Sequence, residues 1–489
     1  MSDPPSPRLN VREWLRNSLL TPRALGFWGV WILLQLSWAW HVSLPLPDQV
    51  GVMAGVTLAF WGLFQAYARR RARETRVQLG FALLILLSFG GELALVHLFP
   101  DRTYAPLTLL PLMTLFLVFW VGRRAALLES ILAAIWSGFL WPDPAGAIWY
   151  RVLLSLAIIQ FLYPLSSRWH FYRLIGAFTG VTLFAILTTS ARHTVLLPTL
   201  PAFLNPVGWT LLEDAVVFGS LFLLLPVYER LFQITTDLTL LDLLTLEHPL
   251  IQELGRKAPG TFSHSLAVAN LAEAAARRIG ANPLLVRVGG LFHDIGKVFR
   301  PEYFIENQMG RENPHDQLAP RVSVLILIAH VKDGVRLARQ HRLPEPIIRI
   351  IQTHHGTTLM RPFYQKAREA DPHVSEQPFR YPGPKPVSKE EVIVMLADSV
   401  DAACRSIQDP TPRRLEDMMH SVIRGKLEDG QLDESHITLG DLRAIQEAFY
   451  PVLLGLYHPR IPYPGQEDER GRDRGVQSIR ISTRAQIFE

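Results

Sequence analysis

Hydrophobic and polar positions divide this chain of 489 residues into two unlike parts. Up to about residue 228 the sequence is overwhelmingly apolar, whereas from about residue 229 onward charged residues are interspersed as in soluble proteins. A run of about 20 apolar residues can cross the hydrocarbon core of a bilayer as a helix. The first part offers eight such runs, at 24–43, 50–68, 77–98, 105–122, 125–141, 147–165, 172–190 and 208–228. We therefore expect a polytopic helical membrane domain over 24–228, in contact with the lipid bilayer.

Basic residues alternate between the loops that join these runs. The tail of residues 1–23 carries four arginines, the loop 44–49 carries no Lys or Arg, and the loop 69–76 carries five arginines. Because basic loops stay on the cytoplasmic side, the alternation predicts a multi-pass protein of a plasma membrane with both termini in the cytoplasm. The formal net charge of +5 comes partly from these arginine clusters, so we take it as a sign of membrane topology and expect no nucleic-acid polymer as a partner.

Four carboxylates fall within the expected spans: Glu92, Glu129, Glu213 and Asp214. A charged group inside a membrane is costly and often marks a ligand or proton site. The same residues could instead be protonated, hydrogen-bonded between helices or close to an interface. The sequence leaves both interpretations open.

The second part predicts an all-α domain, because strand patterns are scarce and helix signals recur. Asn282-Pro283 and Thr411-Pro412 are each an N-cap followed by proline, and Ser388 with Glu391 forms a capping box. Helices are expected over 262–279, 283–297, 320–341, 344–355, 388–405 and 440–456. We expect a connector over 229–260, the all-α domain over 261–464 and a disordered polar tail over 465–489.

Residue types that bind metals follow one another in a characteristic order in this domain. The pair His293-Asp294 is accompanied by His264, His330, His354, His355 and Asp398. A helical bundle can point side chains from several helices at one metal pair, and adjacent residues diverge by about 100° around a helix. Each doublet can therefore address two metals, or one metal and the substrate. The mixture of imidazoles and carboxylates suits iron, manganese or zinc better than calcium.

Each of these residues also has a structural alternative. The chain holds 16 His, so His264 or His330 taken singly can be a hydrogen-bonded helix residue. The pair His354-His355 can complement the C-terminus of a helix. Asp398 is harder to explain in this way, since a carboxylate on an apolar helix face needs a partner. A second His-Asp dipeptide, His315-Asp316, is expected outside the ligand set.

Short motifs around these residues resemble the seven-transmembrane HD family of metal-dependent phosphohydrolases. They are Phe262-Ser263-His264-Ser265-Leu266, His293-Asp294-Ile295-Gly296-Lys297, Glu306-Asn307-Gln308, Asn313-Pro314-His315-Asp316, His354-His355-Gly356-Thr357-Thr358, Phe379-Arg380-Tyr381-Pro382-Gly383-Pro384-Lys385-Pro386 and Ala397-Asp398-Ser399-Val400. Members of that family have one leading span, a large extracytoplasmic domain, seven further spans and the HD domain. One plus seven spans matches the eight runs here. Only residues 44–49 separate the first two, so we expect the extracytoplasmic domain to be absent.

The resemblance implies a membrane-bound phosphodiesterase that hydrolyses cyclic di-AMP to linear 5′-pApA and so lowers the level of this second messenger. Two divalent metal ions, iron or manganese, would be bound by His264, His293, Asp294, His330, His354, His355 and Asp398, with Asp294 bridging them. Asp294 and Lys297 would act in catalysis, Lys297 by stabilising charge on the phosphoryl oxygens. Thr357, Thr358, Tyr381 and Lys385 would contact the substrate. Lys297 could alternatively complement a helix C-terminus, and the four contacts could alternatively be loop structure.

Two other functions stay open. A cyclic di-GMP phosphodiesterase would share the run 293–297 but usually carries Gly-Tyr-Pro after a later His-His. Here Gly356-Thr357-Thr358 follows His354-His355, and the chain contains no Gly-Tyr-Pro. A membrane receptor or transporter could bind nucleotide in its HD domain without hydrolysing it, although the complete ligand set argues against lost catalysis. A homodimer is compatible with each of these functions, and no sequence feature tests it.

Overall fold

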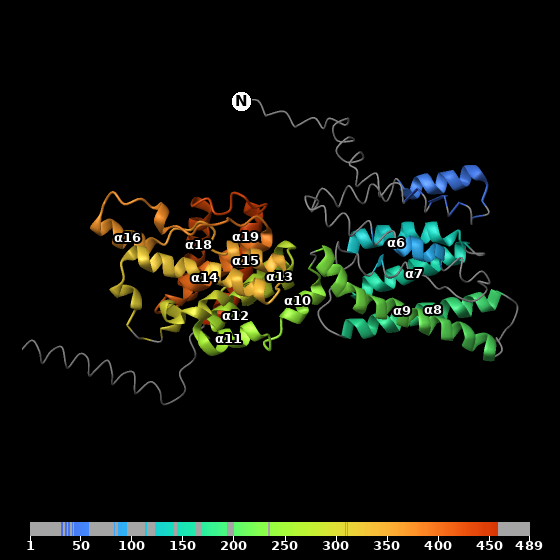
Figure 1. Ribbon diagram of the computed structural model, residues 1–489, viewed down its shortest axis with the longest axis horizontal. Helices are drawn as coiled ribbons and strands as arrows, with labels where there is room; N and C mark the ends of the chain where they lie inside the picture. Colours follow the sequence, from blue (N-terminus) through green and yellow to red (C-terminus); the bar gives the residue numbers. More distant parts are fainter. Residues whose placement is uncertain are drawn as a thin grey trace, which may run out of the picture. The chain divides into compact units, whose positions relative to one another are not determined.

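The chain forms two compact units, Met1–Asp242 and Leu243–Glu489, and both are helical (Figure 1). The structure, a computed structural model, describes residues 123–140, 144–162, 169–192, 200–232, 235–308, 310 and 312–457, together with scattered positions between 31 and 114. The predicted spans 24–43, 50–68, 77–98 and 105–122 lie wholly or largely outside these residues. The predicted tail 465–489 lies outside them entirely.

Four long helices make up most of the described first unit. They are α6 (Arg123–Gly138), α7 (Pro144–Leu162), α8 (Trp169–Arg192) and α9 (Leu200–Phe232), and each packs on the next along the chain. Each covers one of the last four apolar runs predicted from the sequence. The helix α9 begins at Leu200, ahead of the predicted start at 208.

Aromatic rings and paired carboxylates fill the interior of this unit. The rings of Phe89 and Trp136 meet edge to face with centroids 4.6 Å apart. Glu92 and Arg151 form a buried ion pair, and Glu129 accepts a hydrogen bond from the Thr114 hydroxyl at 3.3 Å. Of the four carboxylates singled out from the sequence, these two are therefore buried. The side chains of Glu213 and Asp214 lie outside the described part of the chain.

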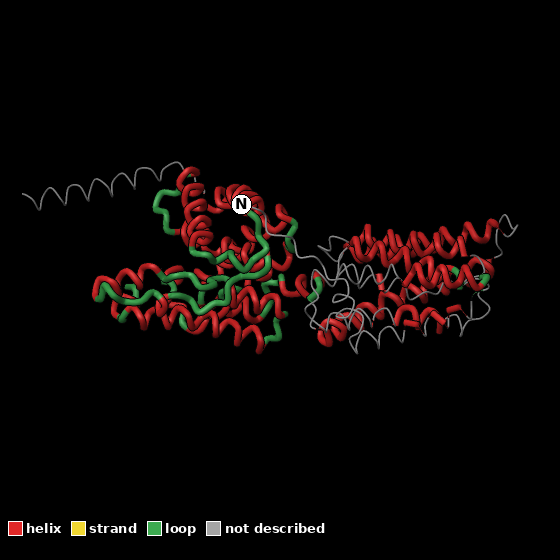
Figure 2. The backbone as a smooth tube through the Cα atoms, turned by 90° about the horizontal axis from the view of Figure 1, so that it is seen from above, coloured by secondary structure: helices red, strands yellow, loops and turns green. Residues whose placement is uncertain are grey.

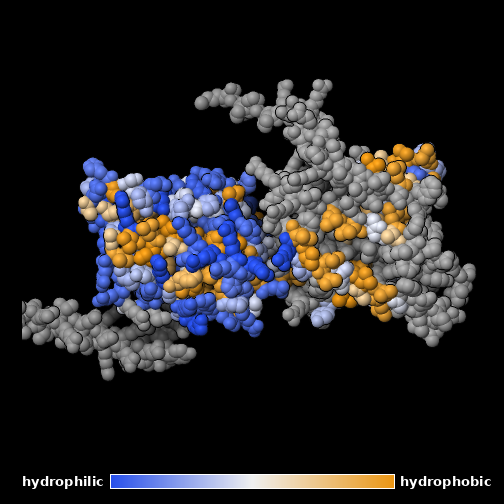
Figure 3. Space-filling view, viewed as in Figure 1, coloured by the Kyte–Doolittle hydropathy of each residue, from blue (hydrophilic) through white to orange (hydrophobic). Residues whose placement is uncertain are grey.

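The described surface of the first unit is largely apolar (Figure 3). Trp149 is 68% exposed and Leu223 is 73% exposed. Within the described ranges, no helix combines the length and the hydropathy required of a candidate membrane span.

The second unit is an all-helical bundle with short 3₁₀ turns (Figure 2). After α10 (Asp237–Leu243) at the boundary, its helices are α11 (Pro249–Lys257), α12 (Pro259–Ile279), α13 (Pro283–Phe292), α14 (Pro320–Gln340), α15 (Glu345–Thr353), α16 (Arg361–Ala370), α17 (Lys389–Arg405), α18 (Pro412–Glu428) and α19 (Leu439–Tyr457). The 3₁₀ turns are η1 (Ile295–Phe299), η2 (Pro301–Tyr303), η3 (Ile305–Asn307), η4 (Pro314–Gln317) and η5 (Gln377–Phe379). Apart from one isolated bridge between Leu359 and Arg380, the described residues contain no β-structure. The all-α prediction is confirmed for this part of the chain.

The helix ends follow the capping residues of the sequence. Asn282 accepts a hydrogen bond from the Leu285 amide at 3.0 Å, and Ser388 and Thr411 cap α17 and α18 in the same way. Gly280 ends α12 with a left-handed φ of 68°, a conformation that suits glycine because it has no Cβ. These local interactions satisfy amide groups that would otherwise lack partners at the helix termini.

Two predicted helix boundaries are wrong. The helix expected over 262–279 begins at Pro259, because proline is well suited to the first helical position, and α10 and α11 occupy part of the expected connector 229–260. The helix expected over 283–297 ends at Phe292, and η1 follows it. The turn η1 packs so tightly on α14 that a Cβ at Gly296 would lie 1.9 Å from the His330 carbonyl oxygen.

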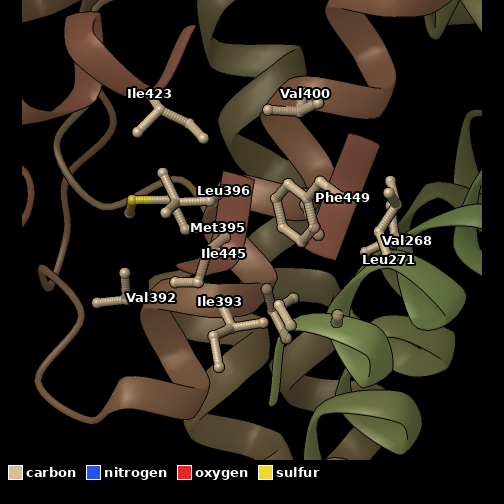
Figure 4. Close-up of a cluster of buried hydrophobic side chains, with 14 of the residues drawn as sticks. Val268, Leu271, Val392, Ile393, Met395, Leu396, Val400, Ile423, Ile445 and Phe449 are labelled. Atoms are coloured by element: carbon tan, nitrogen blue, oxygen red, sulfur yellow. The ribbon is translucent and has the colours of Figure 1, made fainter. Parts of the chain in front are cut away.

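The helix α17 runs through the centre of the second unit. Its residues from Val392 to Ala397 are all buried, so the helix is apolar on every face over this stretch. Figure 4 shows Leu396 beside Ile445 and Phe449, which come from α19. Burying each large apolar side chain contributes about 1.5–3 kcal/mol. This packing fixes the position of the next residue along the helix, Asp398.

Candidate metal centre

The seven predicted metal ligands converge from five helices. His264 lies on α12, His293 ends α13, Asp294 precedes η1, His330 lies on α14, His354 and His355 follow α15, and Asp398 lies on α17. Every one of these residues is buried except His355, which is partly exposed. The bundle therefore brings together residues separated by more than 130 positions, as His264 and Asp398 are.

The ligand atoms form two groups that share one carboxylate. One group holds Asp294, His330, His354 and His355, and the other holds His264, His293, Asp294 and Asp398. Within each group, the candidate ligand atoms all lie within 4.8 Å of one another. Asp294 is the member common to both, which is the arrangement needed to bridge two metal ions.

The two oxygens of Asp294 face different groups. Oδ1 lies 3.4 Å from Nε2 of His330 and 3.6 Å from Nε2 of His354. Oδ2 lies 3.2 Å from Nε2 of His293 and 3.9 Å from Nε2 of His264. One carboxylate thus addresses two separate sets of imidazoles.

Backbone carbonyls orient three of the imidazoles. Nδ1 of His293 lies 2.8 Å from the Gly290 carbonyl oxygen, and Nδ1 of His330 and His354 lies 2.5 and 2.8 Å from the carbonyl three residues earlier. A carbonyl only accepts, so each Nδ1 carries a proton and each Nε2 is the atom that can bind a metal when it is unprotonated. The Nε2 atoms of His330 and His354 are 3.3 Å apart. Two acceptors this close repel each other unless a cation lies between them.

A carboxylate outside the predicted set orients His264. Asp401 Oδ2 lies 2.6 Å from Nδ1 of His264, and Arg405 Nε donates to the same oxygen at 2.6 Å. The hydroxyl of Tyr457, the last residue of α19, donates to Asp401 Oδ1 at 2.7 Å. Nε2 of His264 is then directed at Asp398 Oδ1, 3.0 Å away. The sequence reasoning missed Asp401, although it lies one helical turn from Asp398.

Buried polar atoms without partners show that the centre suits a cation. Among the described residues, Nε2 of His293 and Oδ1 of Asp294 are buried and accept or donate no hydrogen bond. Leaving such atoms unsatisfied is costly. Imidazole and carboxylate donors of this kind match divalent transition metals, so the residues present fit the two ions that the sequence predicted.

The electrostatics of the centre agree with this fit. Burial raises the pKa of Asp294, but the neighbouring His293 and Lys297 lower it well below its usual range. Burial lowers the pKa of His330 to about 3. At neutral pH the carboxylate is therefore ionised and the imidazole neutral, as metal ligation requires.

Lys297 contacts the shared carboxylate directly. Its Nζ lies 2.7 Å from Asp294 Oδ2 and 2.8 Å from Glu306 Oε1. Burial lowers the pKa of Lys297, but these two carboxylates raise it above its usual value, so the ammonium is protonated. Thr261 donates to Glu306 Oε1 at 2.8 Å. The sequence reasoning placed Glu306 in a family motif and gave it no role, and the structure places it as the second partner of Lys297.

The predicted substrate contacts are only partly brought to the centre. The ring of Tyr381 stacks on His355 with centroids 4.2 Å apart and an interplanar angle of 30°. The other three interact with the end of α18 and the residues after it: Thr357 with Gln431, Thr358 with Lys426, and Lys385 with the Gly430 carbonyl. Tyr381 is thus the one of the four that packs on a predicted ligand.

The second His-Asp dipeptide lies in neither metal group. Nε2 of His315 lies 2.9 Å from the Tyr303 carbonyl oxygen, which joins η4 to η2. His315 therefore stabilises the connection between α13 and α14.

Two known protein families match long stretches of this sequence. Residues 261–403 match the HD domain family, and residues 44–236 match the family of 7TM receptors with intracellular HD hydrolase. The second unit is accordingly an HD domain. The two matches follow one another in the order that the description of the second family gives, a 7TM receptor part followed by an HD hydrolase part.

Relatives with names are similar to this chain over part of their length. Cyclic-di-AMP phosphodiesterase PgpH of Listeria monocytogenes is 38% identical over 392 residues, which are 79% of this chain and 53% of that protein. Cyclic-di-AMP phosphodiesterase PgpH of Bacillus subtilis is 46% identical over 241 residues, which are 49% of this chain and 34% of that protein. The crystal structure of the L. monocytogenes PgpH HD domain is 47% identical, covers 43% of this chain and 100% of its own, and has a TM-score of 0.42. The chain spans about half the length, or less, of these curated relatives.

Proposed function

We propose that this protein is a membrane-bound, metal-dependent phosphodiesterase that hydrolyses cyclic di-AMP to linear 5′-pApA. The observation that carries the proposal is the pair of ligand groups that share Asp294. The names of the two PgpH relatives support the choice of substrate. A cell that contains this activity would lower its level of the second messenger.

The seven predicted ligands would hold two divalent ions, iron or manganese. His330, His354 and His355 would hold one ion, and His264, His293 and Asp398 the other, with one oxygen of Asp294 on each. When bound, the ions supply Lewis-acid activation of water and neutralise charge on the phosphodiester. The carbonyls that accept from Nδ1 keep three imidazoles aimed at the ions, and Asp401 does the same for His264.

In the reaction, an oxygen from water forms a bond to phosphorus and the bond from phosphorus to the 3′ oxygen breaks. The 3′ oxygen gains a proton, and the 5′ phosphate stays on the product, which gives the linear dinucleotide. The Lys297 ammonium, 2.7 Å from Asp294, would stabilise negative charge on the phosphoryl oxygens. Glu306 holds this ammonium in place from its other side.

The first unit would be a multi-pass membrane domain. We assign a cytoplasmic tail to 1–23, about eight spans to 24–228, a connector to 229–260, the HD domain to 261–464 and a disordered tail to 465–489. The match of residues 44–236 to a 7TM receptor family and the exposed apolar side chains of α6 to α9 support a bilayer location. The distribution of arginines supports cytoplasmic termini in a plasma membrane.

The direct test is a product assay on the full chain in detergent. The chain is incubated with Mn²⁺ or Fe²⁺ and with cyclic di-AMP or cyclic di-GMP in separate reactions, and the products are identified by chromatography. We expect cyclic di-AMP to be hydrolysed faster than cyclic di-GMP, with linear 5′-pApA as the product. Faster turnover of cyclic di-GMP would contradict the substrate, and binding of cyclic di-AMP without any product would favour a receptor.

Topology has its own test. A reporter fused after residue 48 should lie outside the cytoplasm, and a reporter fused after residue 75 should lie inside it. The opposite pattern would overturn the eight-span arrangement.

A further inference from the structure

A buried lysine lies beside the segment that leads out of the metal centre. Lys426 is on α18 and is 8% exposed. Its Nζ donates a hydrogen bond to the Thr358 hydroxyl oxygen at 2.8 Å. The Thr358 amide in turn donates to the carbonyl of His355 at 3.1 Å. The Lys426 ammonium is therefore connected to a predicted metal ligand through one short turn of backbone.

Unlike the charged groups of Lys297 and Arg380, the Lys426 ammonium has no carboxylate partner among the described residues. Among the residues that the structure describes, no carboxylate oxygen lies within 4.0 Å of Lys426 Nζ. By contrast, Lys297 is held between two carboxylates, and Arg380 is paired with Asp429 at 3.0 Å. Within the described part of the chain, the side chain that pairs with Lys426 is a neutral hydroxyl.

A buried charge of this kind destabilises the folded protein. Burial lowers the pKa of Lys426 to about 8, while the more distant Asp398 and Asp429 act to raise it. The ammonium is still mainly protonated at neutral pH. A buried charge without a partner costs free energy, and a bound anion would remove that cost.

The proposed substrate carries such an anion. A cyclic dinucleotide contains two phosphodiesters in one small ring, and only one of them can be at the shared Asp294 when it is cut. The other remains negatively charged and close by. An ammonium is a compact point charge that suits phosphate, and the Thr358 hydroxyl, which accepts from Lys426, still has its own proton to donate.

We propose that Lys426, together with Thr358, binds the phosphodiester that is not being cut. The inference rests on the proposed function and adds a residue that distinguishes a substrate with two phosphodiesters from one with a single phosphodiester. Lys426 is a substrate-binding residue in this account and is not one of the predicted metal ligands.

The test compares two substrates on the full chain in detergent with Mn²⁺. Cyclic di-AMP has two phosphodiesters, and bis(p-nitrophenyl) phosphate has one. In Lys426→Gln, KM for cyclic di-AMP should rise about 10- to 100-fold, the range expected for a lost hydrogen bond to a charged group. KM and kcat for bis(p-nitrophenyl) phosphate should not change. Lys426→Arg, which keeps the charge, should restore most of the affinity for cyclic di-AMP.

Lys366→Gln serves as the matched control, since Lys366 is an exposed lysine on α16. This variant should hydrolyse both substrates with the same KM and kcat as the wild type. An equal loss on both substrates in Lys426→Gln would show that Lys426 maintains the structure of the centre, which overturns the inference. An unchanged KM for cyclic di-AMP also overturns it. If the wild-type chain cleaves only bis(p-nitrophenyl) phosphate, the proposed function itself fails, and the inference fails with it.

Discussion

In the first unit the buried carboxylate of Glu92 is paired with the Arg151 guanidinium, whereas in the second unit the buried carboxylate of Asp294 faces four imidazoles. Those of His293, His330, His354 and His264 lie between 3.2 and 3.9 Å from its oxygens. A carboxylate beside a guanidinium is already balanced in charge. Asp294 also meets the Lys297 ammonium through Oδ2, but its Oδ1 faces the Nε2 atoms of His330 and His354, a combination of atoms that suits a metal ion.

The difference separates two reasons for burying a carboxylate. A buried ion pair contributes little net stability and is costly to break, so the Glu92–Arg151 pair has a structural explanation. The Asp294 group instead gathers atoms that can bind a metal, and backbone carbonyls that accept from Nδ1 direct the Nε2 atoms of three imidazoles into the group. A buried carboxylate surrounded by several potential metal ligands therefore points to a functional site more strongly than a carboxylate in a simple ion pair does.

The largest expected loss of hydrolysis comes from removing the shared carboxylate. Asp294→Ala removes one ligand oxygen from each group, so we expect hydrolysis of cyclic di-AMP to fall at least about 1000-fold. The measurement is the initial rate of product formation with Mn²⁺, together with the metal content per chain. Asp316→Ala, at the exposed residue of the second His-Asp dipeptide, is the control and should retain full activity. Substantial hydrolysis by Asp294→Ala would contradict the bridging assignment.

A smaller effect is expected from the carboxylate behind His264. Asp401→Asn keeps the shape but removes the negative charge that holds Nδ1–H of His264. Losing such a partner typically lowers metal affinity about 10- to 100-fold. Titration with Mn²⁺ followed by electron paramagnetic resonance measures this without any substrate. The matched control is Asp333→Asn, whose ion pair with Arg336 is more exposed; an equal change in both variants would refute the role of Asp401.

Metal affinity should also depend on pH. Burial lowers the pKa of His293, but Asp294 and Asp398 raise it to about 10, so the metal-free protein carries a proton there at neutral pH. A metal ligand must be neutral, and binding therefore releases that proton. Metal affinity should therefore fall as the pH falls, because the proton on His293 competes with the metal. Calorimetric titrations in buffers of different ionisation enthalpy count the protons released, and a count of zero would contradict this protonation state.

The smallest effect on hydrolysis is expected in the first unit. Glu92→Gln leaves the Arg151 charge buried without its carboxylate, which destabilises a buried pair by about 3–5 kcal/mol. Thermal unfolding of the full chain in detergent should show the loss, whereas hydrolysis at low temperature should stay within about twofold of wild type. A large loss of hydrolysis in a chain that is still folded would mean that this pair takes part in signalling to the HD domain.

The sequence predicted those features that depend on neighbouring residues or on the order of residues along the chain. Capping residues such as Asn282 and Ser388 mark helix starts because the cap hydrogen bond lies within three residues. The order of the seven His and Asp residues indicated a two-metal centre, and the structure gathers all seven into two groups. Their role as ligands remains a prediction that metal analysis can test.

The sequence was insufficient where distant packing decides. Asp401 acquires its meaning from His264, 137 residues away, and from Tyr457, 56 residues away. Lys426 has no motif of its own, and only the fold places it beside Thr358. The end of α13 at Phe292 likewise reflects the contact of η1 with α14 rather than any signal in the local sequence.

The close approach of Gly296 to α14 affects how mutational data on this chain should be interpreted. A methyl group there would meet the carbonyl of a residue that itself belongs to the metal centre. Substitution would therefore push His330 out of alignment through its backbone, without changing any ligand side chain. In a saturation scan, the run from His293 to Lys297 should be intolerant at Gly296 as well as at its chemical residues. Activity alone will not distinguish the two causes, but metal content measured at several metal concentrations will.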